Sequence, residues 1–402
     1  MPEAVIVATA RTPIGRAFKG SLVDTRADEL AATIVNAALA KVPELDPAEI
    51  DDLVLGCGLP GGEQGFNLAR VVSVLAGLPN VPGTTVNRYC SSSLQTIRMA
   101  AHAIKAGEGD AFVAAGVECV SRFRKGNSDS LPDTQNPRFE EPGLRSAKRA
   151  DGGQGDWEPA DGLPDIYIAM GQTAENVVEQ EGVSREEMDE FAALSQNRAG
   201  ASQENGFFER EITPVELPDG QTMTRDDGPR PDTTAEKLAT LKPAFRPDGT
   251  VTAGNACPLN DGAAAVIVMS DTRARDLGIT PLARFVASGV SALDPEIMGL
   301  GPIEASRQAL SRAGMTIDDV DLVEINEAFA AQVIPSARHL GIEWDKLNLN
   351  GGSIALGHPF GMTGARIMTT LLNGLEDADK SVGLETMCVG GGQGMAMIVE
   401  RG

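Results

Sequence analysis

Cys90 stands at the junction between a strand-like segment, residues 84–89, and a helical pattern. Leu94, Ile97 and Ile104 repeat at helical spacing, so a helix is predicted to begin directly after the cysteine. The first turn of a helix has unpaired N–H groups and a partial positive charge, and both stabilise a thiolate. We therefore expect the pKa of Cys90 to lie below the ~8.5 of an ordinary thiol, and the residue to act as a nucleophile. The alternative is an inert thiol, because free cysteines are often part of a core.

His358 is the second candidate for chemistry, because it lies in the glycine-rich segment GGSIALGHPFGMTGAR directly before a predicted helix. Glycines allow a backbone to approach a ligand closely, and histidine is the side chain most often used as a general base. The chain has only three histidines. His102 falls within a predicted helix and His339 near a helix end, so we expect both to be structural or exposed.

Cys388 and Asn326 each stand at the end of a predicted strand. Cys388 leads into three glycines, residues 390–392, where a hairpin would leave N–H groups open to hold a developing oxyanion. A plain glycine turn beside a buried thiol is an equally good interpretation. Asn326 follows the strand LVEI and opens the block NEAFA, so its side chain could cap the next helix or hold a water near a reacting oxygen.

The two ends of the chain repeat a pattern, which indicates an internal duplication. Two apolar strands, each preceded by an amphipathic helix, contain Leu53 and Leu322, which are 269 positions apart. Cys119 and Cys388 have the same separation, and on this offset Cys90 falls one residue past the candidate histidine. Generic α/β patterning is the alternative, but three landmarks in register favour two similar α/β halves that face each other.

Residues 121–249 differ in character from the two halves. The first part of this region is polar and rich in proline and glycine, so it cannot bury a core of its own, and loops of this length are usually functional. Ser184 and Glu187 have the spacing of a capping box at a helix start. We expect three units: an N-terminal half of 1–120 plus 250–272, a loop domain of 121–249, and a C-terminal half of 273–402.

The composition argues against nucleic-acid and membrane partners. The chain has 402 residues, 45 glycines and a formal net charge of −23, and such an acidic surface repels phosphate backbones and anionic lipid heads. No run approaches the ~18 apolar residues of a membrane span, and the N-terminal segment predicts a strand and not a signal peptide. The five cysteines are scattered without metal-ligand spacing, so we expect no metal and a reducing cytoplasm.

Four blocks in order make the chain resemble the thiolase family along essentially its whole length: NRYCSSSLQ, NEAFA, NGGSIALGHPFGMTGAR and CVGGGQGMAMIVE. The resemblance implies the five-layered α-β-α-β-α thiolase fold, built from the duplicated halves, with an inserted loop domain for CoA binding and oligomer contacts. It also implies a homodimer or a dimer of dimers, coenzyme A as a substrate, and no permanently bound cofactor.

By the same resemblance, Cys90 matches the nucleophile that becomes acylated, and His358 matches the histidine that activates it. Cys388 matches the cysteine that moves the α-proton, and Asn326 matches the asparagine that fixes a water. The backbone N–H groups of Cys90 and Gly390 would hold the oxyanion of the acyl intermediate. The implied reaction is cleavage of a 3-oxoacyl-CoA by CoA, giving acetyl-CoA and a shortened acyl-CoA, with Claisen condensation as its reverse.

The resemblance also implies contacts with coenzyme A. Arg230 matches a basic residue at the nucleotide end, and solvated surface charge is the alternative for it and for Lys237. Lys237 and Cys257 both stand where relatives often carry serine, so hydrogen bonds to the pantetheine arm need not be kept. The other expected contacts with the CoA arm are Met170, Ala253, Ala328 and Phe329.

Ala169 bears on the branch of the family. Thiolases that specialise in acetoacetyl-CoA resemble this sequence there but carry a histidine before the Met-Gly pair. Together with the NRYCSSSLQ block, the alanine favours the degradative branch, as in fatty-acid β-oxidation, with association with other β-oxidation enzymes as a further expectation. A biosynthetic acetoacetyl-CoA thiolase (acetyl-CoA C-acetyltransferase) is the alternative. A condensing enzyme of the ketoacyl-synthase type and an inactive lipid carrier are disfavoured, because Cys388 and the other catalytic candidates are all present.

Overall fold

The computed structural model describes residues 2–125 and 133–402, and one path of strands runs through both ends of the chain. The strands are β1 (Ala4–Arg11), β2 (Gly15–Arg16), β3 (Asp52–Gly56), β4 (Gly83–Val86), β5 (Ala111–Cys119), β6 (Val215–Glu216), β7 (Thr222–Met223), β8 (Asn260–Ser270), β9 (Ala283–Ala292), β10 (Leu322–Ile325), β11 (Val382–Val389) and β12 (Gln393–Glu400). The main path has the order β4-β3-β5-β8-β1-β9-β12-β11-β10, with β2 paired to β8, while β6 and β7 form a separate pair.

The pairing pattern repeats in the two halves of this path. In the first half β3 is parallel to β5, β5 is antiparallel to β8, and β8 is antiparallel to β1. In the second half β10 is parallel to β11, β11 is antiparallel to β12, and β12 is antiparallel to β9. Cys119 and Cys388 lie at equivalent places, near the ends of β5 and β11. The duplicated α/β halves predicted from the sequence are therefore confirmed.

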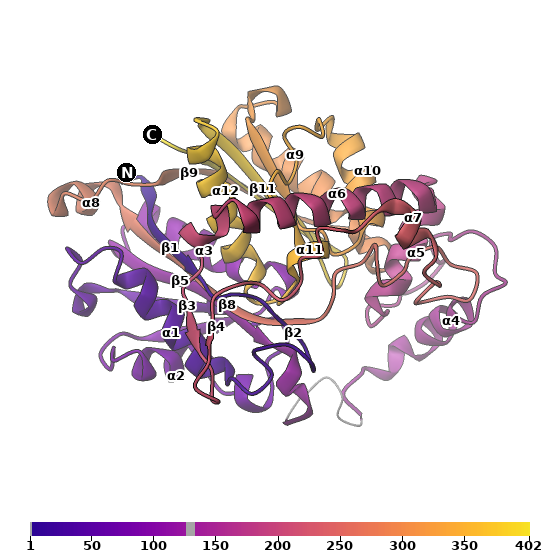
Figure 1. The fold of residues 1–402 in the computed structure, drawn as a ribbon, viewed down its shortest axis with the longest axis horizontal. Coiled ribbons are helices and arrows are strands. Elements are labelled where there is room, and N and C mark those ends of the chain that lie inside the picture. The colour runs from indigo at the N-terminus through magenta and orange to yellow at the C-terminus, as the bar shows by residue number, and fades with distance from the viewer. Residues whose placement is uncertain (1, 126–132) are drawn as a thin grey trace.

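The helices form layers on both sides of each half-sheet (Figure 1). They are α1 (Ala27–Leu39), α2 (Leu68–Leu75), α3 (Ser92–Ala106), α4 (Glu140–Ala150), α5 (Met170–Glu181), α6 (Arg185–Glu204), α7 (Ala235–Ala239), α8 (Asp271–Leu277), α9 (Gly301–Ala313), α10 (Ala330–Leu340), α11 (Ser353–Leu356) and α12 (Thr363–Asp377). One apolar core holds α1 and α2 against the first half-sheet, and another holds α9 and α10 against the second. A third core places α3 and α12 between the two half-sheets, which gives the predicted five layers.

Strand β5 shows why the sequence produces this layering. Val113 and Val117 face the outer core with α1, whereas Phe112 and Ala114 face the central core with α3 and α12. Because successive side chains of a strand point to opposite faces, a strand covered on both sides must be apolar almost throughout. The run AFVAAGV meets that requirement, and every residue of β5 is buried.

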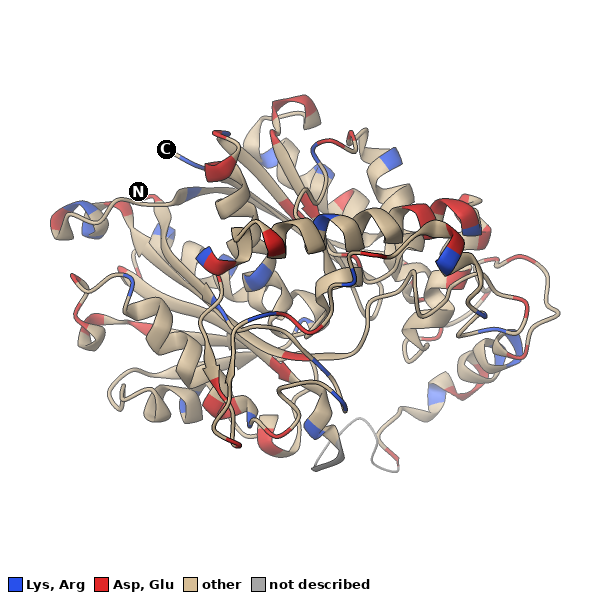
Figure 2. Ribbon diagram, viewed as in Figure 1, with Lys and Arg blue, Asp and Glu red and all other residues tan. Residues whose placement is uncertain are grey.

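Within the inserted region, α4 lies at the right of Figure 1, whereas the long helix α6 crosses the middle of the view in front of the two halves. The predicted capping box is present: the Ser184 hydroxyl accepts the Glu187 N–H at 3.2 Å, and the Glu187 carboxylate accepts the Ser184 N–H at 2.9 Å, so α6 begins where expected. Residues 126–132 of the predicted loop domain lie outside the described residues. Figure 2 shows acidic residues on outer helices and loops of all three predicted units, in keeping with the net charge of −23.

The central layer depends on close contact between α3 and α12. A Cβ added at Gly364, in the first turn of α12, would lie 2.3 Å from the backbone nitrogen of Leu94 on α3. Gly374, later in α12, has no atom closer than 3.5 Å to an added Cβ. The two glycines therefore sit in the same helix with opposite steric surroundings.

We predict that Gly364→Ala lowers the free energy of unfolding by about 1–3 kcal/mol or more, because neither helix backbone can move without disturbing the core. Gly374→Ala should be neutral or raise that free energy by up to about 1 kcal/mol, since alanine is the better helix former. Urea denaturation followed by circular dichroism would measure both variants. Equal effects at the two positions would contradict the close contact between α3 and α12.

Candidate active site

Cys90 lies in a short 3-10 turn, Tyr89–Ser91, that leads directly into α3. Burial raises the pKa of its thiol to about 11, although hydrogen bonds from the backbone N–H groups of Gly390 and of Cys90 itself act in the opposite direction. The prediction that the helix start lowers this pKa is therefore wrong. It counted the N–H groups and the helix dipole but not the loss of hydration, which here is the largest influence. In the resting protein the Cys90 side chain is therefore a neutral thiol.

Tyr89 sets the direction in which the chain enters this turn. Its φ of 43° lies in the left-handed region, which costs a residue other than glycine about 1–2 kcal/mol. The preceding strand β4 is held by its pairing with β3, and the following helix α3 is held by packing in the central core, so the bend falls between them. Strained backbone of this kind is often found beside reacting groups.

A cavity of about 350 Å³ lies over Cys90. Gly390 and Gly391 line it next to the thiol, so the same N–H group that bonds the sulfur faces the open space. Its apolar walls come from both halves and from the loop domain, through Leu59, Phe360, Ile166, Ile168 and Met170. A ligand that reaches Cys90 must pass between these side chains, and so loses most of its water.

His358 is buried in ring contact with Phe360, which lines the cavity, and it has a defined tautomer. Its Nδ1 lies 2.7 Å from the Thr363 hydroxyl oxygen, whose own proton is donated to the Pro359 carbonyl at 2.8 Å. Nδ1 therefore carries the ring proton, and Nε2 offers a lone pair. Burial, and next the positive charge of Arg366, lower the pKa of His358 to about 3, so the imidazole is neutral. Thr363 was not among the predicted residues, although it stands only five positions after the histidine.

Asn326 does not cap a helix, so that interpretation of its place in the sequence is wrong, while its role toward a water stays a prediction. Helix α10 begins at Ala330 without a side-chain cap. The Asn326 Nδ2 group instead lies 3.3 Å from His358 Nε2, and its Oδ1 accepts the Ser353 hydroxyl at 2.6 Å. The amide is thus directed at the same imidazole nitrogen that is free to accept a proton.

Cys388 is the second-last residue of β11, directly before the predicted hairpin. The register Val389↔Gln393 joins β11 to β12 across the three glycines, so the hairpin itself is confirmed. Burial, followed by the neighbouring thiols of Cys90 and Cys257, raises the pKa of Cys388 well above its ordinary value. Three neutral thiols therefore share one region, and Cys388 has a proton to give.

The residues expected to contact coenzyme A fall into two groups. Four of them lie near the reacting groups. Met170 lines the cavity. The Cys257 N–H donates to the Ala328 carbonyl at 3.0 Å, and the neighbouring residues Ala256 and Phe329 form a β-bridge. Arg230 and Lys237 do not line the cavity. Both side chains are exposed, and the Lys237 ammonium donates to the Asp232 carbonyl at 2.6 Å. Ala253 is also exposed.

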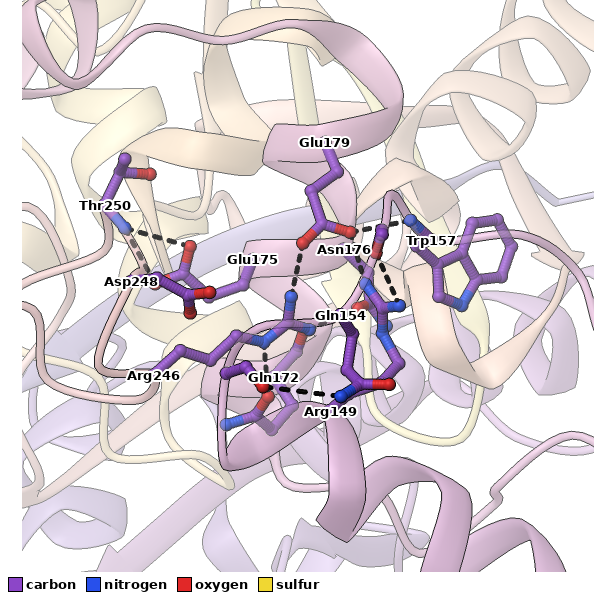
Figure 3. A network of polar contacts seen from close by, with 12 residues as sticks. Arg149, Gln154, Trp157, Gln172, Glu175, Asn176, Glu179, Arg246, Asp248 and Thr250 are labelled. Carbon is purple, nitrogen blue, oxygen red and sulfur yellow. Dashed lines mark hydrogen bonds and ion pairs between the residues drawn. The ribbon is translucent and has the colours of Figure 1, made fainter.

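A buried polar network fixes the helix that carries Met170 (Figure 3). Glu179, on α5, binds the guanidinium groups of Arg149 and Arg246 through its two oxygens. Arg246 also donates to Gln172 in the first turn of α5, at 2.7 Å. Helix α4, the start of α5 and the segment around Arg246 are thereby joined, and the Met170 end of α5 has little freedom to leave the cavity.

Glu118 is a buried carboxylate that the sequence interpretation did not single out. One of its oxygens accepts N–H groups of Gly58 at 2.8 Å and of Gly361 at 2.9 Å. Glu118 thus ties a first-half loop to the second-half loop that follows His358. Gln64 donates to its other oxygen at 2.7 Å. An acidic residue at the end of the otherwise apolar strand AFVAAGVEC was the available signal.

Comparison with known proteins decides the family. Residues 4–272 match the family model of the thiolase N-terminal domain, and residues 279–401 match that of the thiolase C-terminal domain. The chain belongs to the thiolase family. The assignment made from the four sequence blocks is confirmed, and so is the layered fold.

Relatives match this thiolase along its whole length. A 3-ketoacyl-CoA thiolase of Bacillus subtilis is 43% identical over 413 residues, and a β-ketoadipyl-CoA thiolase of Acinetobacter baylyi is 43% identical over 418 residues, each covering 100% of both chains. The dimeric peroxisomal thiolase of Saccharomyces cerevisiae has a TM-score of 0.89 at 37% identity, covering 100% of this chain and 98% of its own. An acetyl-CoA acetyltransferase of Bacillus anthracis has a TM-score of 0.86 at 38% identity, covering 100% and 99%.

Two further observations concern only residues 2–125 and 133–402. No helix there is long and apolar enough to cross a membrane. No group of histidine, cysteine, aspartate and glutamate side chains in those ranges is arranged to hold a metal ion. The histidines that were expected to lie away from the site do so: His102 is exposed on α3, and exposed His339 contacts Glu181.

The raised pKa of Cys90 makes a prediction about its reactivity. Because iodoacetamide reacts with the thiolate, the rate of carbamidomethylation at Cys90 should rise about tenfold for each pH unit between 7 and 10, without a plateau. Mass spectrometry of the Cys90 peptide would give the rate, with a small free thiol in the same tube as the control that levels off near its own pKa. A plateau below pH 9 would mean a preformed thiolate, and the inferred neutral thiol would be wrong.

Proposed function

We propose that this thiolase is an acetyl-CoA C-acyltransferase that cleaves 3-oxoacyl-CoA with CoA, through an acyl intermediate on Cys90. The observation that supports it most is that three groups lie close together around Cys90, beside the cavity. These are a neutral thiol on Cys90, an N–H group of Gly390 directed at that thiol, and the second protonated thiol of Cys388. A nucleophile, an oxyanion donor and a proton source are what carbon–carbon cleavage of a β-keto thioester needs.

The first half of the proposed reaction transfers the acyl group to the enzyme. The Cys90 sulfur forms a bond to the 3-keto carbon while its proton passes to Nε2 of His358, which is the ring nitrogen that carries no proton. The N–H groups of Cys90 and Gly390 stabilise the oxyanion that forms. The bond between C2 and C3 then breaks, and its electron pair forms the enolate of acetyl-CoA. Removal of one such oxyanion donor typically costs about 3–4 kcal/mol of barrier lowering.

The second half of the proposed reaction returns Cys90, His358 and Cys388 to their starting protonation states. Cys388 protonates C2 of the enolate, and Asn326 with its water and His358 stabilises the enolate oxygen. After acetyl-CoA leaves, the Cys388 thiolate takes the proton of an incoming CoA thiol, whose sulfur attacks the acyl-Cys90 thioester. The proton held by His358 returns to the Cys90 sulfur as it leaves. General acid–base help of this kind contributes roughly 10²–10⁴-fold.

A degradative role with substrates longer than acetoacetyl-CoA is supported by the space beside Ala169. A hollow of about 610 Å³ is lined by Ala169 together with Phe139, Leu144 and Ala147, and it shares Tyr167 and Ile168 with the cavity over Cys90. The 3-ketoacyl-CoA thiolases among the relatives point the same way. The acetyl-CoA acetyltransferase among the similar structures keeps the biosynthetic reaction as the second candidate.

Self-association, as a homodimer or a dimer of dimers, is supported by the exposed apolar side chains beside the edge strand β4. Strand β4 ends the path, and next to it Phe66 is 98% exposed, with Val74 and Leu75 of α2 also exposed. An edge strand beside apolar side chains suits a second copy of the chain. A similar structure is described as a dimeric thiolase. The five free cysteines suit a reducing cytoplasm, where other β-oxidation enzymes would be the expected associates.

The test of this function is thiolysis with two substrates under the same CoA concentration. We expect cleavage of a medium-chain 3-oxoacyl-CoA with a higher kcat/KM than for acetoacetyl-CoA, by up to about fourfold per buried methylene. Cys90→Ala should lower kcat for both by at least ~10³-fold. A preference for acetoacetyl-CoA would favour the biosynthetic reaction, and activity that survives in Cys90→Ala would refute the acyl-Cys90 intermediate.

Cys388→Ala separates the two halves of the reaction. The variant should still be acylated at Cys90 by an acyl-CoA, detected as a mass shift of the Cys90 peptide. Exchange of the α-hydrogens of acetyl-CoA with deuterated water, followed by NMR, should slow by about 10²-fold or more, because the proton donor is missing. Unchanged exchange would assign the α-proton to another group.

A further inference from the structure

Arg366 is a fully buried cation on α12, close to the site but without a role in the reaction proposed above. Its Nη2 group donates to the Ser353 hydroxyl oxygen at 2.9 Å. Ser353 stands at the start of α11, and its hydroxyl donates in turn to Oδ1 of Asn326 at 2.6 Å. The guanidinium is thus two hydrogen bonds away from the amide that faces His358.

The hydrogen bonds continue from Asn326 to His358, Thr363 and Pro359, and along this chain each group donates to the next one. The Asn326 amide N–H faces Nε2 of His358 at 3.3 Å, and the Nδ1 proton of the imidazole goes to the Thr363 hydroxyl at 2.7 Å. The chain ends at the Pro359 carbonyl, which can only accept. It begins at Arg366, which can only donate. With both ends fixed, no member of the chain can be reversed without losing a buried hydrogen bond.

The direction matters most at Asn326, because a side-chain amide can turn over. In the reversed orientation its oxygen would face Nε2 of His358, and the imidazole would have to move its proton from Nδ1 to that nitrogen. Nε2 would then have no lone pair for the Cys90 proton, and an oxygen instead of an N–H group would face the enolate. The Ser353 hydroxyl, with Arg366 donating to it, would be left without an acceptor for its own proton.

The surroundings of the chain hold its first two members in place. Glu327, the acid of the NEAFA block, accepts the backbone N–H of Ile354 at 3.1 Å, which positions the first turn of α11 and therefore Ser353. The groups that face Arg366 come from several elements: Glu324 of β10, Glu211 and Glu327 favour its charge, whereas Arg11 opposes it. Burial raises the pKa of Glu324 to about 8.

We infer that Ser353 and Arg366 are positioning residues for catalysis: they fix the amide of Asn326 so that its N–H side faces the reaction and His358 keeps its Nδ1 proton. The inference rests on the proposed function for its kinetic consequence, but the tautomer of His358 is a property of the resting protein. It applies to the chain as it folds, with or without a substrate.

Ser353→Ala is the sharpest variant, because it removes one hydroxyl and leaves both its neighbours intact. Thr369→Ala is the matched control: Thr369 is a buried hydroxyl on α12 that donates only to its own helix, to the Ala365 carbonyl at 2.8 Å. We expect Ser353→Ala to lower kcat for thiolysis and the rate of acetyl-CoA deuterium exchange by about 10- to 100-fold, with KM for CoA within twofold. Thr369→Ala should stay within twofold in all three.

The tautomer of His358 gives a readout that needs no activity. With only three histidines in the chain, the ring ¹⁵N signals can be assigned by replacing His102 and His339 in turn. The native protein and Thr369→Ala should show His358 protonated at Nδ1, whereas Ser353→Ala should show a population protonated at Nε2. An unchanged tautomer together with unchanged exchange in Ser353→Ala would overturn the inference.

A double variant tests whether Ser353 acts through Asn326. If it does, adding Ser353→Ala to Asn326→Ala costs no further activity, whereas independent effects would multiply and would contradict the inference. Arg366→Lys, which keeps a donor and the charge, should retain more exchange activity than Arg366→Met. If Arg366→Met fails to fold, the Ser353→Ala results decide alone. A native protein without thiolase activity would refute the proposed function, and the tautomer measurement would still decide the positioning of Asn326.

Discussion

Loss of hydration around Cys90 and His358 is the constraint on which the rest of the site depends. In this interior the thiol and the imidazole are both neutral, with pKa values of about 11 and about 3, so a resting thiolate–imidazolium pair is disfavoured. The proton can move only when an electrophile arrives and new charge is met by N–H groups already in place. Because the thiol and the imidazole are neutral, hydrogen bonds must orient them, and the donor and the acceptor of each hydrogen bond cannot be exchanged.

Such a site requires groups from distant parts of the chain to meet inside the protein, and the repeated strand order makes this possible. Cys90 lies at the start of α3, and His358 lies just before α12. These two helices form the central layer, so their starts are brought to one place by the same core that holds the half-sheets apart. Glu118 then ties the two loops together through Gly58 and Gly361.

Much of this arrangement could be predicted from the sequence, because apolar runs and register are local patterns. The two halves, the hairpin after Cys388 and the capping box at Ser184 followed from spacing alone. The direction of the Cys90 pKa did not, because a helix start is visible in a sequence whereas the depth of burial is not. The contacts of Asn326 were also beyond prediction, since Ser353 and Arg366 reach it only after α11 and α12 have packed.

The distribution of the reacting groups over the two halves has a consequence for how such an enzyme could arise. The proposed nucleophile, Cys90, belongs to one repeat, whereas His358, Asn326 and Cys388 belong to the other. Cys119 of the first repeat and Cys388 of the second are both buried, but only the pKa of Cys388 is raised by the neighbouring thiol of Cys90. Neither repeat contains all of these groups, so the proposed chemistry needs both repeats in one chain.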